Sequence, residues 1–130
     1  MGGNSASMPG PLPRRLICRN MGSDYSPQEV SQLQADGQIQ LIDVREPHEH
    51  EAGRIAGDRL ITLGTLSAEA HTIDQGRPVV FYCRSGARSA MATQAFSEAG
   101  FDAHNMAGGL LAWDEAGLPL EPDGGYVDVA

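Results

Sequence analysis

Short apolar stretches alternate along most of the chain with polar segments that have helical spacing. Residues 79–82 are continuously apolar and follow Pro78, a pattern that predicts a strand buried on both faces. Residues 39–44, 60–63 and 103–106 are the other strand candidates. Each candidate is short and bounded by glycine, proline or charged residues, so we expect several short strands joined by helices.

The segments between these strands predict helices. Ser26, Pro27 and Glu29 form a helix start with a capping box, and this helix should end before Gly37. A second helix is predicted over residues 89–99, with Met91, Ala92 and Phe96 expected in the core. A last helix is predicted over residues 110–116, and a short one from Ser67. Repeated strand–helix alternation with short links predicts an α/β domain with a parallel sheet.

Composition divides the chain into three parts. Residues 1–15 are rich in glycine, proline and serine and predict a disordered N-terminal segment. Residues 16–120 carry the strand and helix patterns and form the predicted domain. Residues 121–130 combine glycine, proline and acidic residues, which predicts a flexible acidic tail.

Charge and length restrict the function. The 130 residues suit one domain, and the 17 acidic and nine basic residues give a formal charge of -8. That charge argues against nucleic acid as a partner. No apolar run approaches the roughly 18 residues that a membrane helix needs. The N-terminus does not resemble a secretion signal, so we expect a cytoplasmic protein, and nothing in the sequence demands more than a monomer.

The segment after the most apolar strand carries the chemistry. Cys83 follows that strand directly, and residues 84–88 form a short loop before the helix. Ligands of α/β proteins bind at the carboxyl ends of strands. Backbone N–H groups of the loop, the positive end of the following helix, and the charges of Arg84 and Arg88 would favour the thiolate of Cys83, which is the nucleophile. Gly86 permits the tight turn that such a cradle needs.

Other readings of the reactive side chains are open at this point. A cysteine at the end of a buried strand is often an ordinary core residue, although the neighbouring glycine and arginines count against that reading here. Cys18 is expected to be incidental, with a resolving thiol as the alternative. The run of alternating His and Glu over residues 48–51 has metal-ligand types, but solvated side chains are expected there.

Three motifs resemble those of the rhodanese-like sulfurtransferases. CRSGARS (residues 83–89) is similar to their active-site loop, LIDVREPHEHEAGRIAG (residues 41–57) to their first signature, and NMAGGLLAWDEAGLPL (residues 105–120) to their closing segment. Order and spacing match over about residues 22–120. Arg54 stands where the family commonly has histidine, and Asp58 and Arg59 follow Gly57 where the family prefers alanine and a small or polar residue. The resemblance implies a three-layer sandwich in which helices flank a central parallel sheet of about five strands.

The resemblance also implies a role for each site residue. Cys83 would be the catalytic nucleophile that carries sulfur as a persulfide. The substrate-binding cradle around it would consist of Arg84, Ser85, Gly86, Ala87, Arg88 and Ser89. Asp43, Arg45 and Glu46 would support the site, with Asp43 or Glu46 helping Arg88 to close the loop. Trp113 is expected to be a core anchor, and Gly108 and Gly109 to permit a turn.

The implied reaction is the transfer of a sulfane sulfur from thiosulfate or a related small anionic donor. The acceptor would be cyanide, a thiol or a protein cysteine, and no metal or organic cofactor is required. Four residues separate Cys83 from Arg88, whereas cysteine phosphatases of related fold use five. The smaller ring suits one sulfur atom better than a phosphate. A sulfur carrier that depends on partner proteins is the main alternative, and a phosphatase or arsenate reductase is the weaker one.

Overall fold

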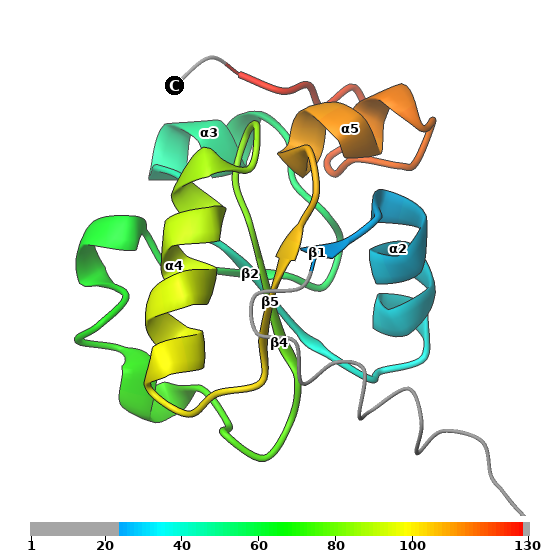
Figure 1. Cartoon of the computed structure of the whole chain (residues 1–130). Coiled ribbons are helices and arrows are strands. Elements are labelled where there is room, and N and C mark those ends of the chain that lie inside the picture. Colours follow the sequence, from blue (N-terminus) through cyan, green and yellow to red (C-terminus); the bar gives the residue numbers. More distant parts are fainter. Residues whose placement is uncertain (1–23, 129–130) are drawn as a thin grey trace, which may run out of the picture.

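The computed structural model describes residues 24–128, so the predicted disordered segment 1–15 and Cys18 lie outside the described residues. Within residues 24–128 the sheet has five parallel strands in the order β1-β5-β4-β2-β3 (Figure 1). The strands are β1 (Asp24–Tyr25), β2 (Gln40–Asp43), β3 (Arg59–Leu60), β4 (Val79–Tyr82) and β5 (Ala103–Met106). The helices are α2 (Pro27–Ala35), α3 (Pro47–Ala52), α4 (Ala87–Glu98) and α5 (Gly109–Glu115). The predicted three-layer arrangement is confirmed.

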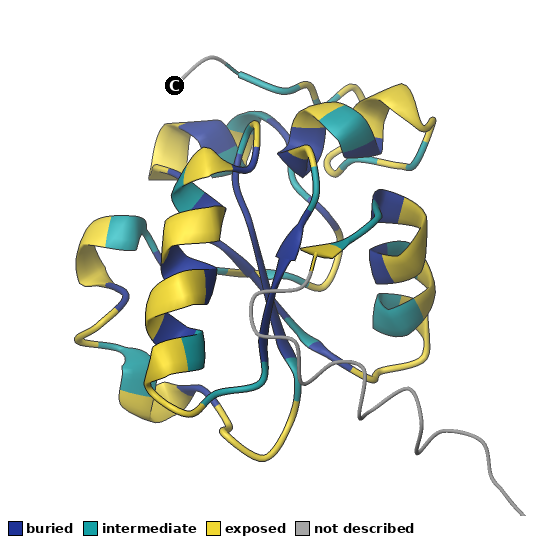
Figure 2. Ribbon diagram, viewed as in Figure 1, coloured by how far each residue is buried: buried dark blue, intermediate teal, exposed yellow. Residues whose placement is uncertain are grey.

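Both faces of the sheet are covered, which explains the apolar run of β4. Figure 1 shows α4 on one side of the sheet, and α2 and α5 on the other. Phe81 packs in the cluster on the α4 side with Phe96, while Val80 and Tyr82 pack in the opposite cluster with Trp113. Side chains of a strand alternate between faces, so a strand covered on both must be apolar throughout. All four residues of β4 are buried (Figure 2).

Local signals place the helices as their sequences predict. The capping box at the start of α2 is present: the Glu29 N–H donates to Ser26 Oγ at 3.1 Å, and the Ser26 N–H donates to Glu29 Oε1 at 2.8 Å. Trp113 on α5 is 3% exposed, and its Nε1 donates to the Pro119 carbonyl at 2.8 Å, consistent with a core anchor. In the described part of the chain, no helix has the length and apolar character needed to cross a bilayer.

Several predicted elements differ from the structure. The strand expected over residues 60–63 is the shorter β3. No α-helix begins at Ser67, which lies in a turn between two 3₁₀ turns, η1 (Leu63–Thr65) and η2 (Ala70–Thr72). β1 and α3 were not predicted, because two residues and six residues give too little periodicity. Met91 was expected in the core but is 62% exposed, because it lies on the side of α4 away from the sheet.

The expected flexible tail is attached to the domain over much of its length. The N–H and carbonyl of Arg54 pair with the carbonyl and N–H of Glu121 at 2.9 and 2.8 Å, and the Tyr126 N–H donates to the Ala52 carbonyl at 2.9 Å. An added Cβ at Gly53 would lie 2.2 Å from the Tyr126 carbonyl oxygen, so the tail lies directly against this glycine. The acidic composition alone gave no sign of these backbone contacts.

Candidate active site

The Cys83 loop, which we define as residues 83–89, places three groups that can donate hydrogen bonds around one sulfur atom. The Gly86 N–H lies 3.1 Å from Cys83 Sγ, and the N–H and hydroxyl of Ser89 each lie 3.4 Å from it. The loop joins β4 to the first turn of α4, so the positive end of that helix faces the sulfur as well. Cys83 is 1% exposed. The arrangement is that of a small anion cradle built around a thiol.

This environment favours the thiolate. Burial alone would raise the pKa of the Cys83 thiol. Hydrogen bonds from the hydroxyl and N–H of Ser89, with those from the N–H groups of Gly86 and Arg88, outweigh burial and hold the pKa below its ordinary value. The thiolate is the form of cysteine that attacks electrophiles.

Two glycines give the loop its shape. Gly86 has φ +104°, a left-handed conformation that glycine adopts without a steric penalty. Gly109, at the start of α5, has φ +63° and lies so close that an added Cβ would be 2.5 Å from the Arg84 carbonyl oxygen. The Leu110 N–H donates to the Cys83 carbonyl at 2.8 Å, and the Leu111 N–H donates to the Arg84 carbonyl at 3.0 Å. The glycine pair before α5 thus does more than permit a turn, because it lets α5 brace the loop.

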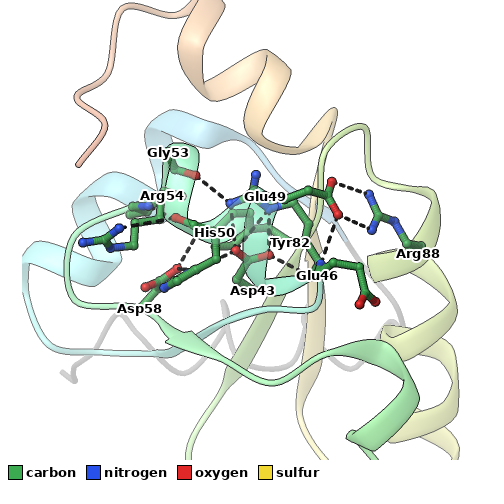
Figure 3. Close-up of polar contacts among 11 residues, drawn as sticks. Asp43, Glu46, Glu49, His50, Gly53, Arg54, Asp58, Tyr82 and Arg88 are labelled. Atoms are coloured by element: carbon green, nitrogen blue, oxygen red, sulfur yellow. Dashed lines mark hydrogen bonds and ion pairs between the residues drawn. The ribbon is translucent and has the colours of Figure 1, made fainter. Parts of the chain in front are cut away.

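The two arginines of the loop differ in their surroundings. Arg88 makes a two-pronged ion pair with Glu49 of α3, with Nη1–Oε1 and Nη2–Oε2 distances of 2.9 and 3.0 Å (Figure 3). The prediction that Asp43 or Glu46 would help Arg88 is therefore wrong, as is the expectation that Glu49 is solvated, because its side chain is fully buried. Arg84 is half-buried, and its Nε has no hydrogen-bond partner among the described residues. Among residues 24–128, no acid pairs with Arg84, so it is the loop arginine without an acidic partner there.

Glu49 owes its ionised state to the loop. Burial alone would raise the pKa of its carboxyl, but the Arg88 guanidinium and the Glu46 N–H, which donates to Oε1 at 3.0 Å, bring the pKa below its ordinary value. The Glu46 side chain itself is exposed. Glu46 therefore contributes to the site through its backbone. Glu49 is the site residue that the sequence interpretation missed, and its position two residues after Pro47, in the first turn of a helix, was the available signal.

Asp43 and Arg45 form a buried ion pair away from the sulfur. Arg45 Nη2 lies 2.8 Å from Asp43 Oδ2, and both side chains are fully buried. Arg45 also donates to the Gly53 carbonyl at 2.7 Å, and its guanidinium lies over the Tyr82 ring, 5.6 Å from the centroid. The pair fixes the chain between β2 and the end of α3. Asp43 and Arg45 therefore support the site indirectly, by holding the chain that follows β2. Among the described residues, none of the hydrogen bonds of their side chains reaches the Cys83 loop.

Asp43 also belongs to a second cluster of polar side chains. His50 Nδ1 lies 3.0 Å from Asp43 Oδ2 and 3.6 Å from Asp58 Oδ2, and the Tyr82 hydroxyl donates to Asp58 at 2.5 Å (Figure 3). Asp43, His50 and Asp58 have the ligand types of a metal site, with ligand atoms within 4.8 Å of one another. Arg45, however, already donates to both carboxylate oxygens of Asp43. A guanidinium at that distance opposes a cation, so we interpret the group as an ion-pair cluster.

Comparison with known proteins identifies the family. A model of the rhodanese-like domain matches residues 26–116. The chain belongs to the rhodanese-like family. It is similar to the putative sulfurtransferase YtwF of Bacillus subtilis, with 38% identity over 82 residues that cover 63% of this chain and 80% of the relative. It is also similar to a sulfurtransferase of Allochromatium vinosum, with 34% identity over 107 residues that cover 80% of this chain and all of the relative.

Solved structures agree with this assignment. A rhodanese-related protein from Thermoplasma volcanium superposes with a TM-score of 0.71 and 26% identity, over 75% of this chain and 96% of that protein. Together, the rhodanese-like fold and the sulfurtransferase relatives support sulfur transfer as the general class of reaction.

Proposed function

We propose that this protein is a sulfurtransferase that moves a sulfane sulfur from thiosulfate, or a related small anion, to a thiophilic acceptor through a persulfide on Cys83. The observation that carries the proposal is the convergence of the Gly86 and Ser89 donors on Cys83 Sγ at the end of a buried strand. Such donors stabilise negative charge on sulfur in both the attacking thiolate and the persulfide product.

In the first half of the reaction, the Cys83 thiolate attacks the outer sulfur of thiosulfate. A bond forms between Cys83 Sγ and that outer sulfur, while the sulfur–sulfur bond of thiosulfate breaks and its electron pair leaves on sulfite. The enzyme then holds Cys83 as a persulfide anion. No proton moves in this step if Cys83 begins as the thiolate, which the lowered thiol pKa favours.

Arg84 supports the choice of an anionic donor. Because Glu49 neutralises Arg88, the unmatched positive charge of the loop belongs to Arg84, whose Nε has no hydrogen-bond partner among residues 24–128. A guanidinium offers several donors in one plane, which suits the oxygens of a sulfonate-like group. This local charge would attract an anion despite the formal charge of -8 on the whole chain.

In the second half, the acceptor attacks the outer sulfur of the persulfide. The persulfide sulfur–sulfur bond breaks, and its electron pair returns to Cys83 Sγ as the thiolate. Cyanide would leave as thiocyanate, and a small thiol or protein cysteine would leave as its persulfide. The Gly86 and Ser89 donors that stabilise the starting thiolate stabilise this leaving group equally.

The direct test is intact-protein mass spectrometry after incubation with thiosulfate, on the wild type and on Cys83→Ser. We expect the wild type to gain the mass of one sulfur atom, to lose it on addition of cyanide or a thiol, and to release one sulfite per sulfur gained. The Cys83→Ser protein should gain nothing, because a serine hydroxyl is a far weaker nucleophile at neutral pH.

Controls separate this proposal from its rivals. Circular dichroism would show that Cys83→Ser folds, and Cys18→Ser should gain sulfur like the wild type. Sulfur on the Cys83→Ser protein would reject Cys83 as the carrier. Hydrolysis of p-nitrophenyl phosphate that depends on Cys83, with no persulfide from thiosulfate or from glutathione persulfide, would replace the proposal with a phosphatase. A stable persulfide that neither cyanide nor thiols discharge would indicate a carrier for partner proteins.

A further inference from the structure

Asn105 is buried beneath the Cys83 loop but comes from a different strand. It lies on β5, in register with Phe81 of β4, and is 6% exposed. Its Oδ1 lies 2.6 Å from Ser89 Oγ, which in turn lies 3.4 Å from Cys83 Sγ. Asn105 therefore reaches the sulfur through one hydroxyl group.

The Ser89 hydroxyl cannot serve both neighbours at once. It has one proton to donate, and its 2.6 Å contact to Asn105 Oδ1 is shorter than its 3.4 Å contact to Cys83 Sγ, so in this structure the proton goes to Asn105. In that state its oxygen can accept a hydrogen bond from a protonated Cys83 thiol. The thiolate or persulfide needs the reverse, with the hydroxyl proton directed at sulfur. The Ser89 oxygen would then face the Asn105 oxygen with lone pairs on both atoms.

An asparagine resolves this conflict by turning its amide. The amide oxygen and nitrogen are nearly equal in size, so exchanging them changes hydrogen bonding and not packing. With Nδ2 facing Ser89, the amide donates to the Ser89 oxygen, and the hydroxyl donates to the charged sulfur. The Asn105 Nδ2 that now points away from Ser89 lies toward Gly86 of the Cys83 loop, 3.8 Å from where an added Cβ at Gly86 would stand, and Asn105 also lines a cavity with Asp24, Thr93 and Ser97.

We propose that Asn105 is a positioning residue that reverses the hydrogen bond of Ser89 whenever Cys83 gains or loses negative charge. This inference rests on the proposed function, in which a Cys83 thiol must lose its proton and become the thiolate before it can attack the donor. Hydrogen bonds in a chain that ends on a charge strengthen one another, so the reversed chain favours the thiolate and the persulfide. An ionised aspartate at position 105 could accept a hydrogen bond from Ser89 but not donate one, and a leucine could neither donate nor accept.

The test is the pH profile of Cys83 alkylation by iodoacetamide, followed on the Cys83 peptide by mass spectrometry. Asn105→Leu and the isosteric Asn105→Asp are each compared in the Ser89 protein and in a Ser89→Ala background. We expect Asn105→Leu to raise the midpoint by about one pH unit, a tenfold loss of thiolate, only when Ser89 is present. Asn105→Asp should raise it further, and part of that rise should vanish with Ser89→Ala.

The comparison between backgrounds makes the outcome decisive. Equal shifts with and without the Ser89 hydroxyl would overturn the proposal, because Asn105 would then act through packing or charge alone. No shift in a folded Asn105→Leu protein would overturn it as well, and the Asn105→Asp comparison decides if Asn105→Leu fails to fold. Iodoacetamide reports the thiolate without any sulfur donor. A protein that shows the coupling but forms no persulfide would thus reject the proposed function and keep the role of Asn105.

Discussion

The Cys83 loop and the Arg45 segment, defined as residues 43–58, lie at the ends of neighbouring strands on the same side of the sheet, yet they use polar residues in opposite ways. In the Arg45 segment, acid and base contact each other: Arg45 pairs with Asp43, and His50 lies between Asp43 and Asp58. In the Cys83 loop, by contrast, the donors of Gly86 and Ser89 converge on one sulfur atom.

The difference distinguishes a scaffold from a site. Buried polar groups that bind each other stabilise the fold. Removing either partner is costly, because the other is left buried without a hydrogen-bond or ion-pair partner. Donors that share a single polarisable atom remain available when charge develops on it. The Glu49–Arg88 ion pair is where the two regions meet, since one partner belongs to each. Four substitutions test this division, from the largest expected effect on the free energy of unfolding to the smallest.

Arg45→Met should be the most damaging change. It keeps much of the side-chain volume but removes the guanidinium that neutralises buried Asp43, which should lower the free energy of unfolding by about 4 kcal/mol. Urea denaturation would measure the loss. The control is Arg59→Met, since Arg59 is 45% exposed and its contacts, a 3.8 Å approach to Glu69 and a 2.6 Å hydrogen bond to Thr72 Oγ1, are surface contacts worth about 1 kcal/mol together. Similar losses from both variants would contradict the view that the Arg45 segment is a buried scaffold.

Gly109→Ala tests the contact between α5 and the Cys83 loop. Gly109 and Gly117 both have positive φ, but an added Cβ at Gly117 meets nothing within 4 Å, whereas at Gly109 it would lie 2.5 Å from the Arg84 carbonyl oxygen. We expect Gly117→Ala to cost roughly 1 kcal/mol from backbone conformation alone, and Gly109→Ala about 2 kcal/mol more from the clash. Thermal unfolding would measure both. If the two variants cost the same, α5 does not brace the loop.

Glu49→Gln separates the ion pair from the helix that carries it. The amide keeps the shape of the side chain but loses the charge that pairs with Arg88, so the free energy of unfolding at neutral pH should fall by about 2 kcal/mol. Because the pKa of Glu49 is lowered in the folded protein, this stabilisation is complete above the unfolded carboxyl pKa of about 4.3. It should disappear as the pH falls through the lower folded value.

Denaturation curves from neutral to acidic pH would follow the gap between the wild type and Glu49→Gln. Glu51→Gln is the matched control, since Glu51 lies on the same helix and is exposed. It should change the free energy of unfolding by less than about 0.5 kcal/mol at every pH. A gap for Glu49→Gln that persisted unchanged in acid would mean that the charge of Glu49 does not stabilise the fold.

Local signals in the sequence predicted β4, the capping box of α2 and the Cys83 loop, because each is written in a few adjacent residues. The contacts between elements could not be predicted in the same way. Arg88 and Glu49 are 39 residues apart, and Ser89 and Asn105 are 16 apart, so each pair meets only because of the strand order β5-β4-β2. The expectation that an acid would pair with Arg88 is correct. Several acids follow β2, however, and the sequence alone does not show which of them α3 places in the interior.

Asp58→Asn should have the smallest effect and, unlike the others, should stabilise the protein. Burial raises the pKa of the Asp58 carboxyl, and the charge of Asp43 adds to the rise, although the Tyr82 hydroxyl and His50 oppose it. A carboxyl with a raised folded pKa favours folding in its protonated form, so its contribution weakens as the pH rises from the unfolded value of about 3.9 through the folded one.

Asparagine keeps an oxygen for the Tyr82 hydroxyl, which donates to Asp58 in the wild type, and cannot ionise. Thermal unfolding at several pH values should therefore show Asp58→Asn about 0.5 kcal/mol more stable than the wild type at neutral pH, with the gap closing in acid. Asp114→Asn, on the exposed surface of α5, should show no such gap. Destabilisation by Asp58→Asn at neutral pH would mean that the ion pair with His50 outweighs the burial of the carboxylate, so that the Arg45 segment depends on that charge for its stability as well.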